Sequence, residues 1–523
     1  MQSAAERLGI DRRLLLGLLG VAVIAFLARL IPVLASAGLH GFIDYDDGVY
    51  MGSALALVRG RIVYRDFVML HPPGIVYVLS PFALLSFVVS DANAFAAARL
   101  GMMILGAINT LLVGAVAARL SRTAALAAAA LYAVWIVPIY TERSTWLVGP
   151  QNTALLLALL VLAVPATNGE RRTETRSEGA LGWRRAALAG LLLGICGAIQ
   201  IWAAVPAVVI LAWIAWRTRD QPGGWLRPTT AYVAAGLATV AVLFAPFLVA
   251  AGPRMIRIII FEQLGRGADN VALLRRITAM EGMPQAATAP IAHVAVVCGA
   301  VLISGAVALT AWRRPVVRPW ATLMAIQAAF LLVTPSFFRH YAAWYAPAAA
   351  ISVGCAVAAL IEAIPDRRRA VVVARLVTAT GLVALLSMTL FPRAVQMRSA
   401  TLPFPAHRVA LALGDARCPT SDSPSLLILT GMMRRMVTNG CPLLVSPTGI
   451  SYDTDRVATN RGSRPNQPEY QAAMRAYYTG SDAVAFIRSD HSNGLSSATW
   501  AAIRARFPVE HHVGRVRIFL PSG

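Results

Sequence analysis

The feature that most constrains this chain is a series of long apolar segments separated by short polar connections. Runs of about 17–25 apolar residues can cross the roughly 30 Å hydrocarbon core of a bilayer, and in lipid such runs must form helices. The composition agrees, because 57% of the 523 residues are hydrophobic and only 14% are charged. The first run, 14–35, is followed by many others, so we expect it to stay as an anchor rather than act as a signal peptide. The chain is predicted to be a polytopic α-helical membrane protein.

The apolar pattern predicts about eleven spans. A further apolar run, 74–89, follows Pro72-Pro73 and contains Pro81, and we expect it to lie at the outer interface without crossing. The predicted spans are 14–35, 94–118, 123–139, 151–166, 185–201, 203–216, 229–251, 290–311, 319–335, 342–362 and 370–391.

Arginine sets the predicted orientation. The formal net charge of +22 comes from arginine alone, since the sequence has no lysine. With 74–89 outside the count, most loop arginines fall in alternate connections, which places these and the N-terminus in the cytoplasm. The acidic segment 44–47, the loops 140–150, 252–289 and 335–341, and the C-terminal part then lie on the outer side. Membrane topology and anionic lipid contact explain the charge better than nucleic-acid binding does. The loop 252–289 is rich in arginine although it is predicted on the outer side, against the positive-inside rule. Binding of an anionic ligand would explain this excess.

Three carboxylates stand just beyond the first span, at Asp44, Asp46 and Asp47. Ionised carboxylates beside lipid are costly unless they face water, a partner or a substrate. They can therefore belong either to a solvated loop that ends a helix or to a reactive site. Asp44 is equally suited to capping the helix that follows as to positioning an acceptor.

The segment that follows resembles the first outer loop of GT-C membrane glycosyltransferases, those related to protein O-mannosyltransferases and the lipid A aminoarabinose transferase. The resemblance covers about the first 365 residues. It implies a GT-C fold with a large first outer loop, a polyprenyl-phosphate sugar donor and a carboxylate base. Family members more often carry Asp-Glu than Asp-Asp, which leaves open which carboxylate acts. The matching residues are Asp46-Asp47, Tyr50, Gly60, Tyr64-Arg65-Asp66, Pro72-Pro73, Arg99 and His340-Tyr341 before Pro347.

Glycosyl transfer needs a base for the nucleophile and positive groups for the departing phosphate. From the resemblance we expect Asp46 to be the base, with Asp47 positioning the acceptor or replacing it. Outer-side arginines can equally contact lipid phosphates, and Arg29 inside the first span can snorkel to the headgroups or face the donor. The candidates for donor phosphate or lipid binding are Arg65, Arg143, Arg266, Arg339, His340, His71 and Arg29, and those for acceptor binding or positioning are Asp44, Tyr50, Asp66 and Tyr341.

Composition changes after Pro392, which divides the chain into a transmembrane catalytic domain, 1–392, and a C-terminal domain, 393–523. Short apolar runs at 426–430, 443–446, 483–488 and 516–520 predict strands, and 469–478 and 497–507 predict helices. A small extracytoplasmic α/β domain is expected. There Cys418 and Cys441 are positioned to form a disulfide, which would contribute about 3 kcal/mol in the chain-entropy model.

The leading hypothesis is a glycosyltransferase of the cytoplasmic membrane. Its partners would be a polyprenyl-phosphate sugar, membrane lipids and a glycan, lipid or protein acceptor. No nucleotide-binding fingerprint is visible, no cofactor is firmly implied, and a divalent metal remains open. The alternative is a transporter or lipid flippase, although such proteins carry ionisable groups within spans and repeated, broken helices. A third interpretation is a non-catalytic scaffold whose C-terminal part binds wall components.

Overall fold

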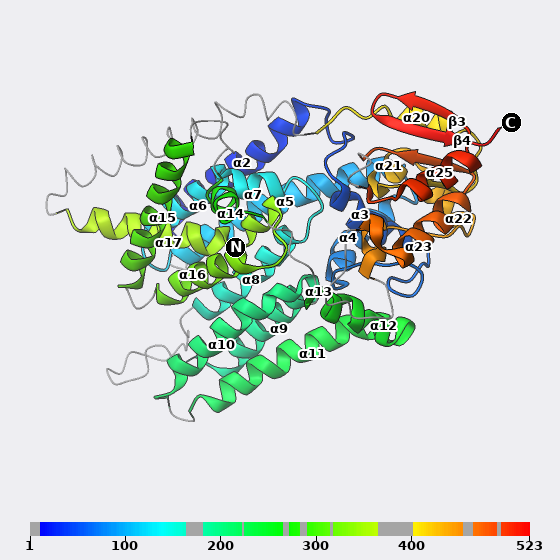
Figure 1. Cartoon of the computed structure of the whole chain (residues 1–523). Helices are drawn as coiled ribbons and strands as arrows, with labels where there is room; N and C mark the ends of the chain where they lie inside the picture. Colours follow the sequence, from blue (N-terminus) through cyan, green and yellow to red (C-terminus); the bar gives the residue numbers. More distant parts are fainter. Residues whose placement is uncertain are drawn as a thin grey trace.

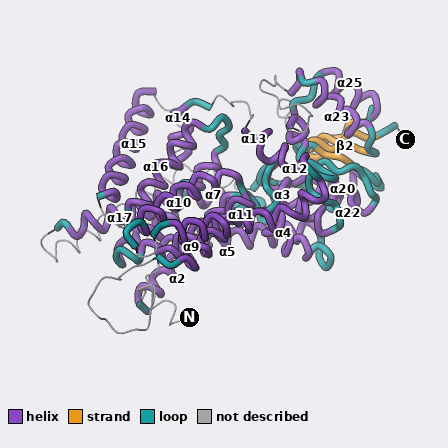
Figure 2. Tube along the Cα trace, turned by 90° about the horizontal axis from the view of Figure 1, so that it is seen from below, coloured by secondary structure: helices purple, strands orange, loops and turns teal. Residues whose placement is uncertain are grey.

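The computed structural model describes residues 11–163, 181–221, 224–264, 271–282, 290–313, 317–364, 401–452, 464–488 and 493–522. Figure 1 shows an elongated bundle of helices with a smaller lobe at one end, formed by the C-terminal residues. Figure 2 shows that the strands gather in this lobe, while helices make up the rest. The predicted helical fold with a small C-terminal α/β part is therefore confirmed.

The predicted spans coincide with helices of the bundle. Among the described residues, four segments are long and apolar enough to cross a membrane: α2, α5, α11, and α10 together with the 3-10 turn η1 (Ile201–Ala203) before it. The predicted span 370–391 lies outside the described residues, so the number of spans stays a prediction. The bundle helices are α2 (Arg12–Leu34), α5 (Asp91–Ala117), α6 (Arg122–Val134), α7 (Ile136–Thr141), α8 (Val148–Ala163), α9 (Trp183–Ile199), α10 (Ala204–Thr218), α11 (Leu226–Ala251), α15 (Pro290–Trp312), α16 (Arg318–Val333) and α17 (Ala346–Glu362).

Local sequence explains several helix ends. Ser90 and Ser121 cap α5 and α6, each accepting a backbone N–H with its hydroxyl. Trp135 takes an extended backbone, with ψ of 126°, and so separates α6 from α7. This break matters because the segment that carries most of the candidate site follows α7 directly.

The first loop folds into two helices, α3 (Tyr45–Val58) and α4 (Gly74–Leu85), which pack against each other. α4 has 12 residues and is therefore about 18 Å long at 1.5 Å per residue, too short to cross the hydrocarbon core. This length agrees with a non-spanning role for 74–89. Shorter connecting elements are α12 (Pro253–Ile256), η2 (Arg257–Phe261), α13 (Glu262–Leu264), α14 (Leu273–Glu281) and η3 (Arg339–Trp344).

The C-terminal lobe holds a four-stranded sheet in the order β1-β2-β4-β3. β1 pairs with β2 in parallel, and the other pairs are antiparallel, with Gly514 at positive φ in the β3–β4 hairpin. The elements are α20 (Ala406–Leu413), β1 (Pro419–Ser421), α21 (Pro424–Leu429), α22 (Met432–Thr438), η4 (Pro447–Tyr452), η5 (Arg464–Asn466), α23 (Pro468–Thr479), β2 (Ala483–Phe486), α25 (Ser497–Arg506), β3 (Val509–Val513) and β4 (Val516–Leu520).

Two predicted strands of the lobe are wrong. The run 426–430 belongs to α21, because Pro424 starts a helix and the apolar residues pack on α3 rather than in a sheet. The run 443–446 is a buried connection without strand pairing. The disulfide is present between Cys418 and Cys441, whose Cα atoms lie 5.6 Å apart. It ties the start of β1 to the segment after α22.

The lobe is not an independent unit, because it shares one apolar core with the first loop. Val49 and Leu55 of α3 belong to the same buried cluster as Leu427 and Met433 of the lobe. At the closest approach, a Cβ on Gly48 would overlap the backbone of Ser425, whose Cα would lie only 2.7 Å away. The Ser425 hydroxyl donates to the Asp44 carbonyl at 2.8 Å. The predicted boundary at 392 lies outside the described residues, and the lobe fixes the start of α3.

Candidate active site

Asp47 is buried and fully engaged. Its Oδ2 accepts from Nε and Nη2 of Arg99 at 3.0 and 2.6 Å, and both side chains have no exposed surface. Its Oδ1 accepts from the backbone N–H and the hydroxyl of Thr145, both at 2.8 Å. Arg99 also donates to the Leu39 and Gly41 carbonyls. Asp47 therefore joins the first loop, α5 and the segment 142–147, and its carboxylate is already neutralised.

Asp44 and Asp46 occupy the N-terminus of α3 in a different way. Asp44 is the N-cap, with its side chain accepting from the Tyr45 N–H, so its capping interpretation is confirmed. Burial raises the pKa of Asp44, and the Arg488 guanidinium of the lobe works in the opposite direction. Asp46 lies in the first turn of α3 and is only partly buried. Of the two neighbouring carboxylates, Asp46 is thus the one that a ligand can reach.

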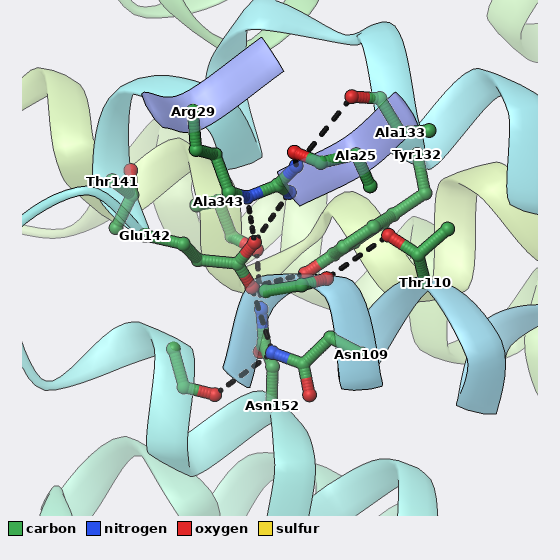
Figure 3. A network of polar contacts seen from close by, with 12 residues as sticks. Ala25, Arg29, Asn109, Thr110, Tyr132, Ala133, Thr141, Glu142, Asn152 and Ala343 are labelled. Atoms are coloured by element: carbon green, nitrogen blue, oxygen red, sulfur yellow. Dashed lines mark hydrogen bonds and ion pairs between the residues drawn. The ribbon is translucent and has the colours of Figure 1, made fainter. Parts of the chain in front are cut away.

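The first residue of the segment 142–147, Glu142, forms a buried ion pair with Arg29 (Figure 3). Arg29 of α2 donates to Glu142 Oε2 from Nε and Nη2 at 3.1 and 2.5 Å. Glu142 Oε1 accepts from Asn109 Nδ2 and the Tyr132 hydroxyl, both at 2.7 Å. The exposed fractions of the two charged side chains are 0% and 1%. Four hydrogen bonds from three residues, one each on α2, α5 and α6, thereby fix the residue immediately before Arg143.

Two arginines approach the ring of Tyr140 at the end of α7. The Arg143 and Arg339 guanidinium carbons lie 4.8 and 5.3 Å from the ring centre. Within the part of the chain that the structure describes, neither forms a salt bridge, and the buried Nε of Arg143 has no hydrogen-bond partner. Burial chiefly lowers the pKa of Arg143, and the like charge of Arg339 adds to the effect. A partly buried and an exposed cation on one ring form a site for an anion that solvent can reach.

Tyr140 is also within electrostatic reach of the carboxylates at the start of α3. Burial raises the pKa of Tyr140 above its usual range, Asp44 and Asp46 raise it further, and Arg143 and Arg339 lower it. The acidic end of α3 and the arginine pair therefore act on one phenol. This juxtaposition of a reachable carboxylate and paired cations is the candidate site.

His340 and Tyr341 follow Arg339 in η3. The His340 ring packs against Trp146 at an interplanar angle of 31°, with centres 4.4 Å apart, and burial lowers the pKa of His340 to about 3. His340 is therefore neutral near pH 7 and can offer a hydrogen bond rather than a charge. Tyr341 packs against Trp202 at 4.5 Å and borders a cavity of about 380 Å³ that His71 also lines.

The remaining predicted residues lie apart from the arginine pair. Arg65 is exposed and pairs with Asp66 at 2.8 Å, which keeps the pKa of Asp66 below its usual range. Asp66 also accepts the Ile62 N–H, so it fastens a turn. Tyr50 is buried with its ring 5.7 Å from that of His71. Arg266 lies outside the described residues, and Arg29 is committed to Glu142 instead of the surface.

The sequence did not single out several residues that build the site. Glu142, Asn109 and Thr145 belong to no recognisable motif. The one sequence feature that could have indicated Glu142 is that acidic residues are rare next to the spans of this chain. The aromatic residues at 140 and 146 fit a general aromatic belt at the membrane interface as well as they fit a binding site. From the lobe, the Arg488 guanidinium carbon lies 4.5 Å from the centre of the Tyr45 ring. Among the described residues, no group of three or more His, Cys, Asp or Glu side chains is placed to hold a metal ion.

With this geometry, the chain has the fold of the GT-C glycosyltransferases that use lipid-phosphate sugar donors. It is similar to ArnT from Cupriavidus metallidurans bound to undecaprenyl phosphate, with a TM-score of 0.57 and 13% identity over 95% of this chain and 97% of that one. It is also similar to the oligosaccharyltransferase AglB from Archaeoglobus fulgidus in complex with an inhibitory peptide and a dolichol-phosphate, with a TM-score of 0.52 and 14% identity over 91% and 69%.

The chain spans little more than half of other structures of the Archaeoglobus enzyme, 57% of the form tethered to an acceptor peptide. No protein-family model matches the sequence, and no curated protein matches it. At identities of 13–14% the structural similarity shows the fold alone, and it does not show the activity.

Proposed function

We propose that this protein is a membrane glycosyltransferase that moves a sugar from a polyprenyl-phosphate donor to a hydroxyl or amine of an extracytoplasmic acceptor. The observation that carries the proposal is the pair Arg143 and Arg339 on Tyr140, beside the partly exposed carboxylate of Asp46. An anion site next to a base is what transfer from a phosphate leaving group requires. The resemblance of the fold to an undecaprenyl phosphate-bound transferase supports the choice of donor.

Asp46 is assigned as the general base. It accepts the proton of the acceptor nucleophile as the nucleophile attacks the anomeric carbon, and the bond from that carbon to the phosphate oxygen breaks. Asp47 suits this role less, because Arg99 and Thr145 already occupy both of its oxygens. Asp47 instead holds α3 against the segment 142–147 and so positions Asp46.

Arg143 and Arg339 are assigned to the leaving phosphate. The phosphate gains negative charge as the glycosidic bond breaks, and two preorganised cations stabilise that charge more than they stabilise the ground state. Removing one such donor typically lowers kcat by about 10²–10³-fold. Arg143 needs no rearrangement for this task, because Glu142 before it and Thr145 after it are both anchored.

The cavity of about 380 Å³, which Tyr341 borders and the arginine pair does not, is assigned to the sugar of the donor, whose phosphate is assigned to Arg143 and Arg339. Its wall is mostly apolar, with Trp202 and Tyr341 as ring surfaces. Two buried polar atoms at this wall, Gln200 Oε1 and Ser336 Oγ, have no hydrogen-bond partner among the residues that the structure describes. Buried unpaired polar groups are costly, and sugar hydroxyls would satisfy both.

The decisive experiment is transfer from a radiolabelled polyprenyl-phosphate sugar by the purified full-length protein. Asp46→Asn and Arg143→Gln should fold normally and lose at least about 100-fold in turnover. The matched controls are Asp415→Asn and Arg408→Gln, both exposed, with Arg408 on α20, which packs on β3 and β4 of the lobe. Transfer by Asp46→Asn at the wild-type rate would remove Asp46 from the chemistry, and equal losses in the controls would remove the assignment of the whole site.

The extracytoplasmic location has its own test. In a background with Cys196, Cys298 and Cys355 replaced by Ser, a cysteine is introduced at exposed Arg408 of the lobe or at exposed Asp220 after α10. Intact cells treated with an impermeant maleimide should be labelled at 408, whereas 220 should need permeabilisation. The reverse pattern would invert the orientation and with it the side on which the donor is used.

A further inference from the structure

Arg276 belongs to the arginine-rich outer loop, but its guanidinium is buried against backbone carbonyls. The residue lies on α14 and is 7% exposed. Its Nη1 donates to the carbonyls of Leu331, Leu332 and Thr334 at 3.1, 3.3 and 2.6 Å. Its Nε donates to the Val271 carbonyl at 3.1 Å. The guanidinium therefore fastens α14 to the end of α16, which accounts for one of the arginines that depart from the positive-inside rule.

These carbonyls lie where α16 ends and the chain becomes irregular. The last four carbonyls of a helix have no partner within it, and a cation at this end complements the helix dipole. Residues 334–338 then form neither helix nor strand before η3 begins. The Arg276 guanidinium carbon also lies 5.5 Å from the centre of the Phe337 ring. Arg276 thus contacts this connection at its start, Thr334, and again near its end.

The connection 334–338 carries one part of the candidate site and leads directly to another. Thr334, Pro335 and Ser336 line the cavity of about 380 Å³. Arg339 follows the connection as the first residue of η3. A change in the path of this short segment would therefore move the cavity wall and Arg339 together.

The other end of α14 is fixed to the segment that leads to Arg143. The indole Nε1 of Trp135, at the break between α6 and α7, donates to the Glu281 carbonyl at 3.1 Å. Gly282, which ends α14 at a φ of +76°, packs so closely that a Cβ would lie 2.7 Å from Ile136 Cγ2. The contacts of α14 include α7, α16 and η3. One short helix therefore touches both of the arms that bring the arginine pair together.

We propose that Arg276 is a positioning residue for the donor phosphate and that it acts through Arg339. By holding the connection 334–338 on α14, it sets the place of Arg339 relative to Arg143, so that both guanidinium groups engage one phosphate. The inference rests on the proposed function, in which these two arginines bind the leaving phosphate. Preorganised groups lose much of their effect when they are misplaced by about 1 Å, so a residue that sets their spacing changes donor binding without touching the donor.

The test is the binding of radiolabelled undecaprenyl phosphate to the purified full-length protein in nanodiscs, as a saturation curve that gives both the Kd and the number of sites. Arg276→Met removes the N–H donors, keeps a long aliphatic side chain and should raise the Kd by about tenfold. The matched control is Arg275→Met, which changes the neighbouring, exposed arginine of α14 and should leave the Kd within about twofold of the wild type. A purely structural role would instead lower the number of sites and leave the Kd of the folded fraction unchanged.

Arg339→Gln supplies the background that shows whether Arg276 acts through Arg339. In that background Arg276→Met should change the Kd by less than about twofold, because the group that it positions is gone. Arg276→Lys covers the case in which Arg276→Met does not fold. It keeps the charge but lacks the planar fork of donors, so the Kd should rise by about threefold, again only when Arg339 is present.

The outcomes separate this inference from the proposed function. An unchanged Kd in the Arg276 variants, an equal rise in Arg275→Met, or a loss that adds fully to that of Arg339→Gln would overturn the inference and leave the proposed function standing. Absence of saturable binding by the wild type would contradict the proposed function itself, and the inference with it.

Discussion

The ion pair between Arg29 and Glu142 gives the sharpest quantitative prediction. Glu142→Gln keeps an acceptor for Asn109 and Tyr132 but removes the charge opposite Arg29. The new amide group would also point its N–H donors at the guanidinium. Breaking a buried pair from one side costs about 3–5 kcal/mol, since the remaining charge is left uncompensated. We expect this loss in the free energy of unfolding, measured by denaturant titration in detergent micelles.

A double-mutant cycle separates the pair from general packing effects. Arg29→Met alone should also cost about 3–5 kcal/mol, because it leaves the Glu142 carboxylate buried with neutral donors. Arg29→Met/Glu142→Gln removes both charges and keeps the Asn109 and Tyr132 bonds, so it should cost only about 1–3 kcal/mol. Additive losses near 6–10 kcal/mol, or a Glu142→Gln protein within about 1 kcal/mol of the wild type, would refute this reasoning.

Four further predictions test the frame around the site. Asp47→Asn should lower the free energy of unfolding by about 3–5 kcal/mol, whereas Asp46→Asn should change it by less than about 1 kcal/mol in the same titration, since Asp47 is fully buried against Arg99 and Asp46 is partly exposed. Gly48→Ala should loosen the lobe, because its Cβ overlaps Ser425 at a cost of about 1–3 kcal/mol, seen as faster proteolysis of the lobe. Cys418→Ser should destabilise the lobe by about 3 kcal/mol, measured by hydrogen exchange with and without reductant. Burial raises the pKa of Asp422 to about 6, so the lobe should lose stability, by up to about 3 kcal/mol, as pH rises from about 4 to 6; Asp422→Asn should abolish that slope.

The sign of the Asp422 effect follows from proton binding. Above its unfolded-state pKa of about 3.8, the folded lobe holds this proton more tightly than the unfolded chain does. The stabilising contribution of the proton is therefore complete at low pH and disappears as pH passes the folded-state pKa. Hydrogen exchange of the two backbone amides just after β2 that donate to Asp422, those of Ile487 and Arg488, should report this change. Stability that increased with pH in this window would contradict the burial of an uncharged Asp422.

The sequence predicted the helical frame because hydrophobic segment length is a local property. The helices α2, α5 and α11 fall within a few residues of the predicted spans, and α4 is short as expected. The secondary structure of the lobe was harder to predict, because a short apolar run is equally typical of a strand and of a buried helix. Leu426 to Leu429 became helical through Pro424 and the packing against α3, and neither effect is visible in the periodicity.

The sequence predicted the site residues only where they stand close together in one motif. The acids of the first loop stand together in the sequence, and the Asp46-Asp47 pattern located them. Arg143 and Arg339 meet at Tyr140 although 196 positions divide them in the numbering, since α7 and η3 pack against each other. Glu142 was harder still, because its role depends on Arg29, Asn109 and Tyr132 from three helices. No local pattern encodes such a network.

The different roles of Asp46 and Asp47 follow from helix geometry. Neighbouring residues on an α-helix point about 100° apart, so two adjacent acids in the first turn of α3 cannot share one environment. The helix can turn only one of them toward Arg99, and the anchoring of Gly48 against Ser425 fixes which one it is. Asp47 therefore holds the segment that carries Arg143, whereas Asp46 remains partly exposed, within electrostatic reach of Tyr140. If this is right, Asp46→Glu should keep part of the activity, whereas Asp47→Glu should lose it together with stability, because only the buried position has no room for another methylene.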